Sequence, residues 1–475
     1  MSQRRLVALG TSALLVSAFA TRTTQSLGYD ELFTVWVSQR PWGELIHQAN
    51  LDGFTPPLFY ALVKLFALGG LNLEQLRVLP ILFAGVAALA GFYACERLFG
   101  SGLPVWALVA VPSSAYVFTF AHELRPYSAL LACALAFLGQ LGGHCTAASD
   151  RRAGLLALTA SAFSYLGLLM VVLWVWECRS RRPARVLLGG SLLALILSVP
   201  GLLKASALVT GRIGASIVWS EDPPALSTVF LGLAPVPLNS WVEMVSLVLL
   251  GLLLIVASRQ AESRSFAFLV RAFFLFVAML LALDAVVRIG FAPRYFVLPM
   301  SALLLLIVGV LSRARGAGPA LALLLLGMNG VAISCYLTAR PAPRADWREA
   351  IGRLEKRLGA GGVLLGFPFH HTAVAAHAYA PGLKLGGGYT SRSGPVFWYD
   401  PPASFRGYSF EDLRREDDLE QRMRALASTS DLCILSDEPD VTKTEGVFET
   451  FARLDGVAPF DTGDPRLRAS CRSKA

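Results

Sequence analysis

The chain has 475 residues, of which 55% are hydrophobic and only 16% are charged, and its mean hydropathy is +0.55. This composition excludes an ordinary soluble enzyme and predicts a polytopic α-helical membrane protein. The formal net charge of +9 does not predict a nucleic-acid partner, because in a membrane protein the placement of Lys and Arg in the loops matters more than their sum.

Apolar stretches that approach the length of a membrane span, about 20 residues, fill most of residues 1–339, which we predict to be the transmembrane module. A further run, residues 154–177, is flanked on both sides by arginines that favour the same face, so we expect a short helical hairpin. Counting the hairpin as two passes gives about eleven membrane segments, the first an uncleaved signal anchor. Besides the hairpin, the predicted spans are 6–21, which is the signal anchor, and 77–95, 103–120, 127–143, 186–201, 240–257, 266–287, 294–311 and 318–338.

The arginines at the span ends indicate the sides of the membrane. If the N-terminus is cytoplasmic, the arginines of the short loops lie together on the cytoplasmic face, as the positive-inside rule requires. We therefore predict a multi-pass protein of a bacterial inner membrane whose outer, periplasmic face carries the active site. Four segments reach that face: residues 22–76, which form the first outer loop, and residues 121–126, 202–239 and 288–295.

The first outer loop carries two adjacent carboxylates, Asp30 and Glu31, a few residues beyond the first span. One interpretation is a catalytic loop on the bilayer surface, and the alternative is that Asp30 is the N-cap of a short interfacial helix. Farther along, Asp52 either helps to position an acceptor or forms the turn before Gly53. Two prolines follow Thr55 and mark a sharp return to the membrane surface.

Two arginines that neighbour tyrosines, Arg125 and Arg294, lie at span ends on the same predicted face. Ionisable groups are costly in hydrocarbon, so these are candidate site residues, although a single arginine near a tyrosine is more often an interfacial anchor. Two arginines combined with two carboxylates make a site that can hold an anionic headgroup and deprotonate a hydroxyl. Those are the two requirements of sugar transfer from a lipid phosphate.

Several short motifs resemble those of the family 39 glycosyltransferases of the GT-C superfamily, which include dolichyl-phosphate-mannose-protein mannosyltransferase-like and aminoarabinose transferase-like proteins. The resemblance covers roughly residues 25 to 350 and includes Asp346-Trp347-Arg348 after the last span. No single motif is specific, and their order on one predicted face carries the resemblance. The motifs are Asp30-Glu31, Asp52 to Tyr60, Leu76 to Pro80, Glu96 to Gly100, Glu123 to Tyr127 and Arg294-Tyr295.

The resemblance implies an inverting transferase that moves a sugar from a polyprenyl monophosphate donor, held in the membrane lipid, to a hydroxyl of an acceptor glycan, lipid or protein. Carried over to this chain, Asp30 is the general base with Glu31 beside it, and Asp52 and Thr55 lie in the acceptor loop. Many relatives have His where this chain has Thr55, which puts a role of that His in binding or metal contact in doubt here.

The resemblance also implies which side chains hold the donor phosphate. Arg125 is expected near the phosphate together with Glu123 and Tyr127, and Arg294 is expected as a second phosphate-facing cation beside Tyr295. The acidic residues of the first outer loop are not spaced as a recognised metal motif, so no metal ligand is assigned, and a divalent metal stays open as a cofactor.

Residues 340–475 are expected to form a second, outward-facing domain, because charged residues, Pro and Gly are frequent there and no spanning segment appears. Helical and strand patterns alternate in it, which predicts an α/β fold. Gly386 to Gly388 are expected in a flexible loop rather than in a phosphate cradle. The expected elements are a helix at 346–358, a strand at 363–367, a helix near 411–426 and a strand at 432–435.

The histidines and cysteines of this domain raise the questions of a metal site and of a disulfide. His370, His371 and His377 lie close together without the spacing of a metal motif, so metal binding is not predicted there. A disulfide between Cys433 and Cys471 is compatible with an oxidising periplasm, and the sequence alone leaves it open.

Two other classes of protein compete with a transferase. A transporter or lipid flippase would also be polytopic and basic inside, but transporters place ionisable residues near the midplane and often have two related halves. Here the charges gather at one surface, and no internal repeat is apparent. The third class is a catalytically inactive relative that acts as a membrane scaffold.

Overall fold

A computed structural model describes residues 3–23, 26–52, 55–143, 146–178, 263–287, 293–314, 316–338, 345–367, 369–390, 396–399, 414–416, 419–437, 441–464 and 466–472. The predicted spans 186–201 and 240–257 and the predicted outer segment 202–239 lie outside the described residues. The chain forms two compact units. The helical unit contains the residues up to 23 and the described residues between 49 and 338, and the α/β unit contains residues 26–48 and the described residues from 345 onward.

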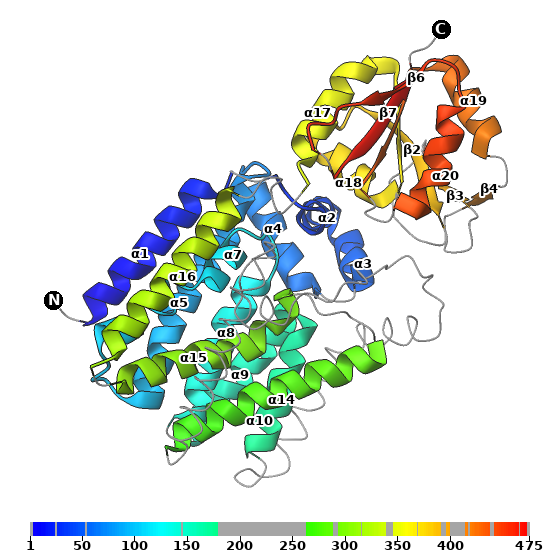
Figure 1. Ribbon diagram of the computed structural model, residues 1–475. Coiled ribbons are helices and arrows are strands. Elements are labelled where there is room, and N and C mark those ends of the chain that lie inside the picture. The colour runs from blue at the N-terminus through cyan, green and yellow to red at the C-terminus, as the bar shows by residue number, and fades with distance from the viewer. Residues whose placement is uncertain are drawn as a thin grey trace. The chain divides into compact units, whose positions relative to one another are not determined.

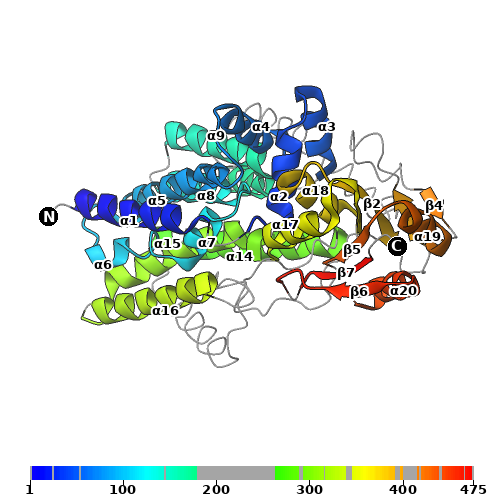
Figure 2. The same cartoon turned by 90° about the horizontal axis from the view of Figure 1, so that it is seen from above.

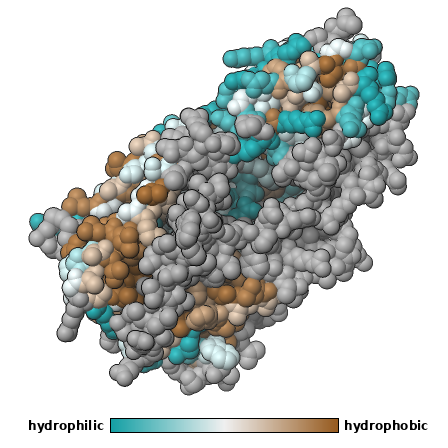
Figure 3. Space-filling view, viewed as in Figure 1, coloured by the Kyte–Doolittle hydropathy of each residue, from teal (hydrophilic) through white to brown (hydrophobic). Residues whose placement is uncertain are grey.

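The helical unit contains helices long and apolar enough to cross a membrane, at Gln75–Phe99, Arg264–Leu283 and Arg294–Arg313, together with shorter apolar helices. Its described surface in view is largely hydrophobic, whereas that of the α/β unit is largely hydrophilic (Figure 3). The helices are α1 (Gln3–Thr21), α4 (Pro57–Leu68), α5 (Val78–Phe99), α6 (Val105–Leu108), α7 (Ala115–Ala121), α8 (Tyr127–Gly142), α9 (Ala147–Phe163), α10 (Leu168–Cys178), α14 (Arg264–Val287), α15 (Val297–Arg313) and α16 (Gly318–Thr338). The total of eleven membrane segments stays a prediction.

Small residues allow the helices to approach closely. Helix α5 packs along α8 (Figure 2), and Gly139 of α8 lies against the backbone of Ala94, where a Cβ would come within 2.6 Å of the Ala94 Cα. Close approach of this kind is the usual basis of helix packing in membranes, because lipid chains supply no hydrophobic drive between helices. Substituting Gly139 would therefore separate α5 from α8.

The prediction of one continuous span over residues 103–120 is wrong, because the structure breaks this segment into α6 and α7. The Ser114 hydroxyl accepts the Tyr116 N–H at 3.3 Å, and the Asn329 side-chain carbonyl of α16 accepts the Ala115 N–H at 2.7 Å. These side chains replace the helical hydrogen bonds that the break removes. With α15 and α16, the break lines a mainly apolar cavity of about 60 Å³.

The structure confirms the helical hairpin predicted over residues 154–177. Helix α9 ends at Phe163, a short 3-10 turn η2 (Tyr165–Gly167) follows, and α10 returns beside α9. Gly167 lies against the backbone of Ala160, where no side chain would fit. The Trp174 indole N–H donates to the Asp150 carbonyl at 3.0 Å and ties the two arms together.

The helix ends define two ends of the helical unit. The rings of Phe99 and Phe266 lie 5.4 Å apart, Arg313 stacks on Phe266 at 4.2 Å, and Gly142 lies against Phe268. The ends of α5, α8 and α15 and the start of α14 are therefore together. The starts of α5, α8 and α15 lie at the opposite end, which we call the polar end.

The α/β unit is built on a seven-stranded sheet with strand order β4-β3-β2-β1-β5-β7-β6. The central strand β1 pairs parallel with β2 and β5, and the outer pairs are antiparallel. The strands are β1 (Val363–Gly366), β2 (Lys384–Thr390), β3 (Val396–Tyr399), β4 (Arg414–Glu416), β5 (Leu432–Ser436), β6 (Val457–Phe460) and β7 (Arg468–Arg472).

Helices cover both faces of this sheet (Figure 1). Helices α19 (Leu419–Thr429) and α20 (Val441–Ala452) enclose a core with β1 and β5, while α17 (Trp347–Leu358) and α18 (Phe369–Tyr379) contact β1 from the other side. Both central strands are buried throughout, as expected for parallel strands covered on two faces.

The elements expected in this region agree in part with those observed. The helix expected at 346–358 and the strands expected at 363–367 and 432–435 are present as α17, β1 and β5. The helix expected near 411–426 begins later, at Leu419. The expected loop at Gly386 to Gly388 is wrong, because these glycines belong to β2. There Gly387 has a φ of +140° and lies so close to the backbone of Gly366 that no side chain would fit.

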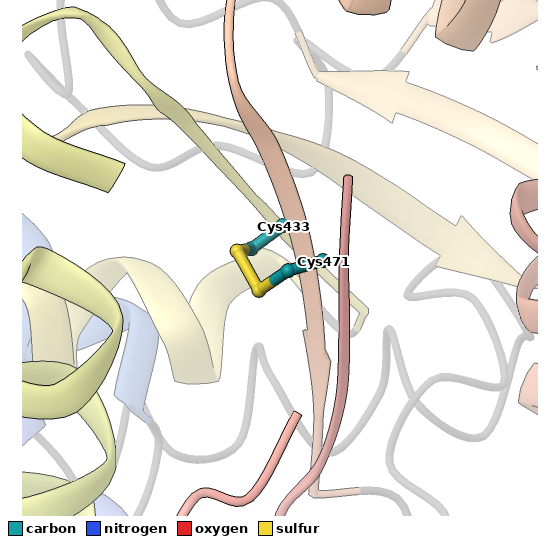
Figure 4. Close-up of a disulfide and its surroundings, with 2 residues drawn as sticks. All are labelled: Cys433 and Cys471. Atoms are coloured by element: carbon teal, nitrogen blue, oxygen red, sulfur yellow. A yellow bond between two sulfur atoms is a disulfide. The ribbon is translucent and has the colours of Figure 1, made fainter. Parts of the chain in front are cut away.

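A disulfide joins Cys433 of β5 to Cys471 of β7 (Figure 4). The two residues are direct partners in the antiparallel pairing of these strands, with 4.1 Å between their Cα atoms. The bond that the sequence left open is therefore present, and it links two neighbouring strands of the sheet.

Two further helices, α2 and α3, precede the apolar helix α4. Helix α2 (Tyr29–Ser38) and most of α3 (Trp42–Asp52) belong to the α/β unit, and α2 packs against α18 (Figure 2). The loop that carries the adjacent carboxylates is thus folded onto the domain encoded more than 300 residues later.

Candidate active site

Hydrogen bonds between distant segments hold the polar end of the helical unit together. The Thr21 hydroxyl at the end of α1 lies 2.8 Å from His122 Nε2, just after α7. The Arg77 guanidinium donates to the Arg22 carbonyl at 2.6 Å. These contacts join the chain that leaves α1 to the segments that precede α5 and α8.

Arg125 lies in the short turn between α7 and α8, at this polar end. Its side chain is only 5% exposed, and its Nη1 donates to the Tyr60 hydroxyl of α4 at 3.4 Å. An interfacial anchor would expose its guanidinium to headgroups, so burial argues against the anchor alternative for Arg125. A buried guanidinium requires anionic or strongly polar partners, and the Tyr60 hydroxyl is one of them.

The residues on either side of Arg125 fix its position. The Arg125 N–H donates to the Glu123 carbonyl at 2.6 Å in a tight turn. Tyr127, the first residue of α8, is buried, and its ring lies 5.3 Å from that of Phe120 in α7. Contacts with both α7 and α8 therefore hold the main chain at Arg125.

Arg294 lies in the 3-10 turn η3 (Pro293–Phe296) that leads into α15. Its guanidinium is 5.4 Å from the centre of the Tyr295 ring, a cation–π contact, and Tyr295 is buried. Because η3 precedes α15 and Arg125 precedes α8, both arginines lie at the polar end. The structure therefore brings the two predicted phosphate-binding cations to one end of the helical unit.

Arg77, which the resemblance also includes, has a different character. It is 1% exposed, it precedes α5, and its guanidinium donates to the main chain of the α1–α2 connection. This contact makes it a structural link within the polar end. The same holds for His122, which the sequence did not assign: its Nδ1 lies 2.9 Å from the Phe118 carbonyl.

The two adjacent carboxylates of the first outer loop have different surroundings. Glu31 is 2% exposed and its carboxylate accepts the Gly28 N–H at 2.9 Å, so it closes the start of α2. Asp30 is half-buried at the second position of the helix. The alternative in which Asp30 is the N-cap is wrong, because Gly28 occupies that position.

The remaining predicted site residues lie between the end of α3 and the start of α4. Thr55 is 2% exposed and precedes Pro56, the N-cap of α4. Asp52 is the last residue of α3, and its side chain lies outside the described part of the structure. Their roles in the acceptor loop stay predictions, as do those of Asp30, Glu31 and the phosphate-binding residues.

The Asp346-Trp347-Arg348 motif has a structural role at the start of α17. Asp346 Oδ1 accepts the Glu349 N–H at 3.1 Å, and its own N–H donates to Asp464 at 2.7 Å. Burial would raise the pKa of Asp464, but hydrogen bonds from Arg466 and from the Asp346 N–H hold it below its ordinary value. Among the described residues, no group of three or more His, Cys, Asp or Glu side chains is placed to hold a metal ion.

No protein-family model matches the sequence, and no curated protein matches it. Solved structures do match. The fold is similar to that of ArnT from Cupriavidus metallidurans in the apo state, with a TM-score of 0.61 and 14% identity over 98% of this chain and 97% of that chain. The chain has the ArnT fold. The same protein bound to undecaprenyl phosphate matches with a TM-score of 0.58 and 15% identity over the same shares.

The ArnT fold confirms, at the level of the fold, the resemblance to GT-C proteins of the aminoarabinose transferase type. The apolar helices of the helical unit, three of them long enough to cross a membrane among the described residues, fit the predicted membrane protein. The match extends over nearly the whole chain, so it includes both units.

Proposed function

We propose that the protein is an inverting glycosyltransferase that moves a sugar from a polyprenyl-phosphate donor to an acceptor hydroxyl at the outer face of the bacterial inner membrane. The observation that carries the proposal is the ArnT fold over 98% of the chain, one of whose solved forms is bound to undecaprenyl phosphate. The buried Arg125 at the polar end is consistent with an anionic ligand in that fold.

In the proposed reaction the acceptor oxygen attacks the anomeric carbon of the donor sugar. The bond between that carbon and the phosphate oxygen breaks, and the polyprenyl phosphate leaves with the bonding electrons. Asp30 takes the proton of the attacking hydroxyl. Attack opposite to the leaving phosphate inverts the configuration at the anomeric carbon.

Arg125 and Arg294 are proposed to neutralise the charge that grows on the leaving phosphate. Guanidinium forks match phosphate oxygens in a bidentate way, and fixed cations cost no reorganisation at the moment of reaction. Glu31 has a supporting role in this scheme, because its carboxylate is engaged by the Gly28 N–H and holds the start of the helix that carries Asp30.

The periplasmic placement of the α/β unit is part of the proposal. Disulfides persist in oxidising compartments and are rare in the cytosol, so the bond between Cys433 and Cys471 supports an extracytoplasmic location. The positive-inside distribution of arginines predicts the same side for the first outer loop.

The test uses the full-length protein in proteoliposomes with a panel of radiolabelled polyprenyl-phosphate sugars and envelope lipids and glycans as acceptors. Asp30→Asn should abolish transfer, because the amide cannot accept the proton, while the protein remains folded and inserted. Glu44→Gln is the matched control, since Glu44 is an exposed carboxylate of the same loop. Normal transfer by Asp30→Asn would remove Asp30 from the mechanism.

A further inference from the structure

We infer that helix α18 of the α/β unit positions the proposed base Asp30, with His371 and Tyr379 as the positioning residues. The inference rests on the proposed function and assigns the C-terminal domain a part in it. All the contacts that carry it lie within the α/β unit, between residues 26–39 and α18 or its neighbours.

The first contact holds the residue immediately before Asp30. The Tyr29 ring contacts the His371 ring with 3.9 Å between centroids and an angle of 44° between the ring planes. His371 is fixed in turn by Asp437, because its Nδ1 lies 2.8 Å from both carboxylate oxygens, which requires Nδ1–H to donate. The imidazole is therefore oriented by the Asp437 carboxylate and contacts the Tyr29 ring.

The second contact holds the chain just before α2. The Leu27 N–H donates to the Tyr379 hydroxyl at 3.3 Å, and the Ser26 hydroxyl lies 3.5 Å from the same oxygen. Leu27 is fully buried, so the main-chain N–H that Tyr379 accepts is removed from water and its loss would be costly. The chain thus enters α2 from a fixed point on α18.

The third contact holds the other end of α2. The His377 Nε2–H donates to the Gln39 side-chain carbonyl oxygen at 3.0 Å, just after the helix ends at Ser38. Burial, and then the positive charge of Arg40, lower the pKa of His377, so the neutral imidazole is the form that makes this bond at pH 7. Both ends of a ten-residue helix are therefore tied to α18.

This arrangement explains how a helix of only ten residues in the first outer loop can hold the proposed base in a precise position. Short helices are marginal in water and gain their order from tertiary packing. A base misplaced by about 1 Å can cost on the order of 10² in rate. Contacts before, within and after α2 supply the order that the isolated loop lacks.

The test measures transfer by full-length Tyr379→Phe and His371→Ala variants in proteoliposomes. Tyr379→Phe removes only a hydroxyl and should lower kcat about 10-fold, and His371→Ala should lower it about 100-fold, both with donor KM within about twofold of the parent. His371→Asn, which keeps a donor for Asp437, should recover part of the loss. The matched control is Arg353→Gln, which breaks ion pairs with Glu349 and Asp461 elsewhere in the same unit and should leave kcat unchanged.

Hydrogen exchange separates positioning from general destabilisation. The amides of residues 26–39 should exchange faster in Tyr379→Phe and His371→Ala, while those of β1 and β5 keep their protection. Unchanged kcat in both variants, or lost kcat with unchanged exchange at residues 26–39, would overturn the inference. Asp30→Asn tells the two proposals apart: an active Asp30→Asn refutes the base, whereas an inactive one beside normal Tyr379→Phe and His371→Ala refutes only the positioning.

Discussion

The two units hold their candidate site residues by different means. In the helical unit Arg125 is buried in a turn between two packed helices, so the bundle itself fixes the cation. In the α/β unit Asp30 lies near the start of a short helix that depends on a capping carboxylate and on contacts with α18. Rigid packing therefore fixes the cation, and a small set of hydrogen bonds and ring contacts fixes the carboxylate. Changes at the cation should therefore act on the phosphate, and changes around the carboxylate should act on its placement.

After Asp30→Asn, the largest effect should come from the buried cation. Arg125→Gln is expected to lower kcat/KM for the donor by about 10² to 10³, because one fixed donor to the growing charge is lost. Arg125→Lys keeps the charge without the bidentate fork and should recover part of the loss. Donor kinetics in proteoliposomes measure both, with the exposed Arg152→Gln of α9 as control. Parent-like kinetics for Arg125→Gln would show that burial of this arginine serves only the fold.

A smaller effect should separate the two adjacent carboxylates. Glu31→Gln keeps an oxygen that can accept the Gly28 N–H, so transfer should stay within about threefold of the parent, in contrast to Asp30→Asn. Glu31→Ala loses that acceptor and should destabilise the start of α2 by about 1 kcal/mol. The measurements are initial rates and hydrogen exchange at residues 28–32. If Glu31→Gln were inactive, the Glu31 carboxylate would take part in the reaction together with Asp30.

The smallest effect should be a pH dependence of the α2 contact. Because the folded state lowers the pKa of His377 from 6.5, the unfolded state binds the proton more readily. The stability contributed by the neutral imidazole is therefore complete above pH 6.5 and is lost as the pH falls through the lowered pKa. Exchange at residues 36–40 should be faster at about pH 5 than at about pH 7, and His377→Gln, which cannot titrate, should reduce this difference after correction for the intrinsic rate. If exchange at residues 36–40 depended on pH equally in the parent and in His377→Gln, titration of His377 would not be the cause of the pH dependence.

Hydropathy and charge predicted much of the helical unit. Long apolar runs gave α5, α8, α14, α15 and α16, and arginines on both sides of residues 154–177 indicated the hairpin. The break between α6 and α7 was missed because hydropathy alone was used, although Pro112 and the two serines after it are local signals for a helix end. The partner of the freed Ala115 amide, Asn329, lies far along the chain and could not be predicted. Hydropathy indicates whether a segment lies in apolar surroundings, but it does not indicate which group hydrogen-bonds to the backbone of that segment.

The α/β unit shows the same limit for the candidate site. The sequence predicts a loop at the triple glycine, because no local signal shows that Gly387 must pass close to the backbone of Gly366. The carboxylates of the first loop are recognisable from their position after the first span. Their attachment to α18 could not be predicted, because Tyr29 and His371 carry no shared pattern and meet only through the fold.

The most direct test of the central claim is the fate of the donor. Purified protein in proteoliposomes, given a labelled polyprenyl-phosphate sugar and acceptor, should release free polyprenyl phosphate in an amount equal to the sugar attached to the acceptor, with inversion at the anomeric carbon. Mass spectrometry of the lipid fraction measures the released polyprenyl phosphate, and NMR of the product fraction measures the anomeric configuration. Intact donor that has only changed leaflet would instead identify a flippase and contradict the account.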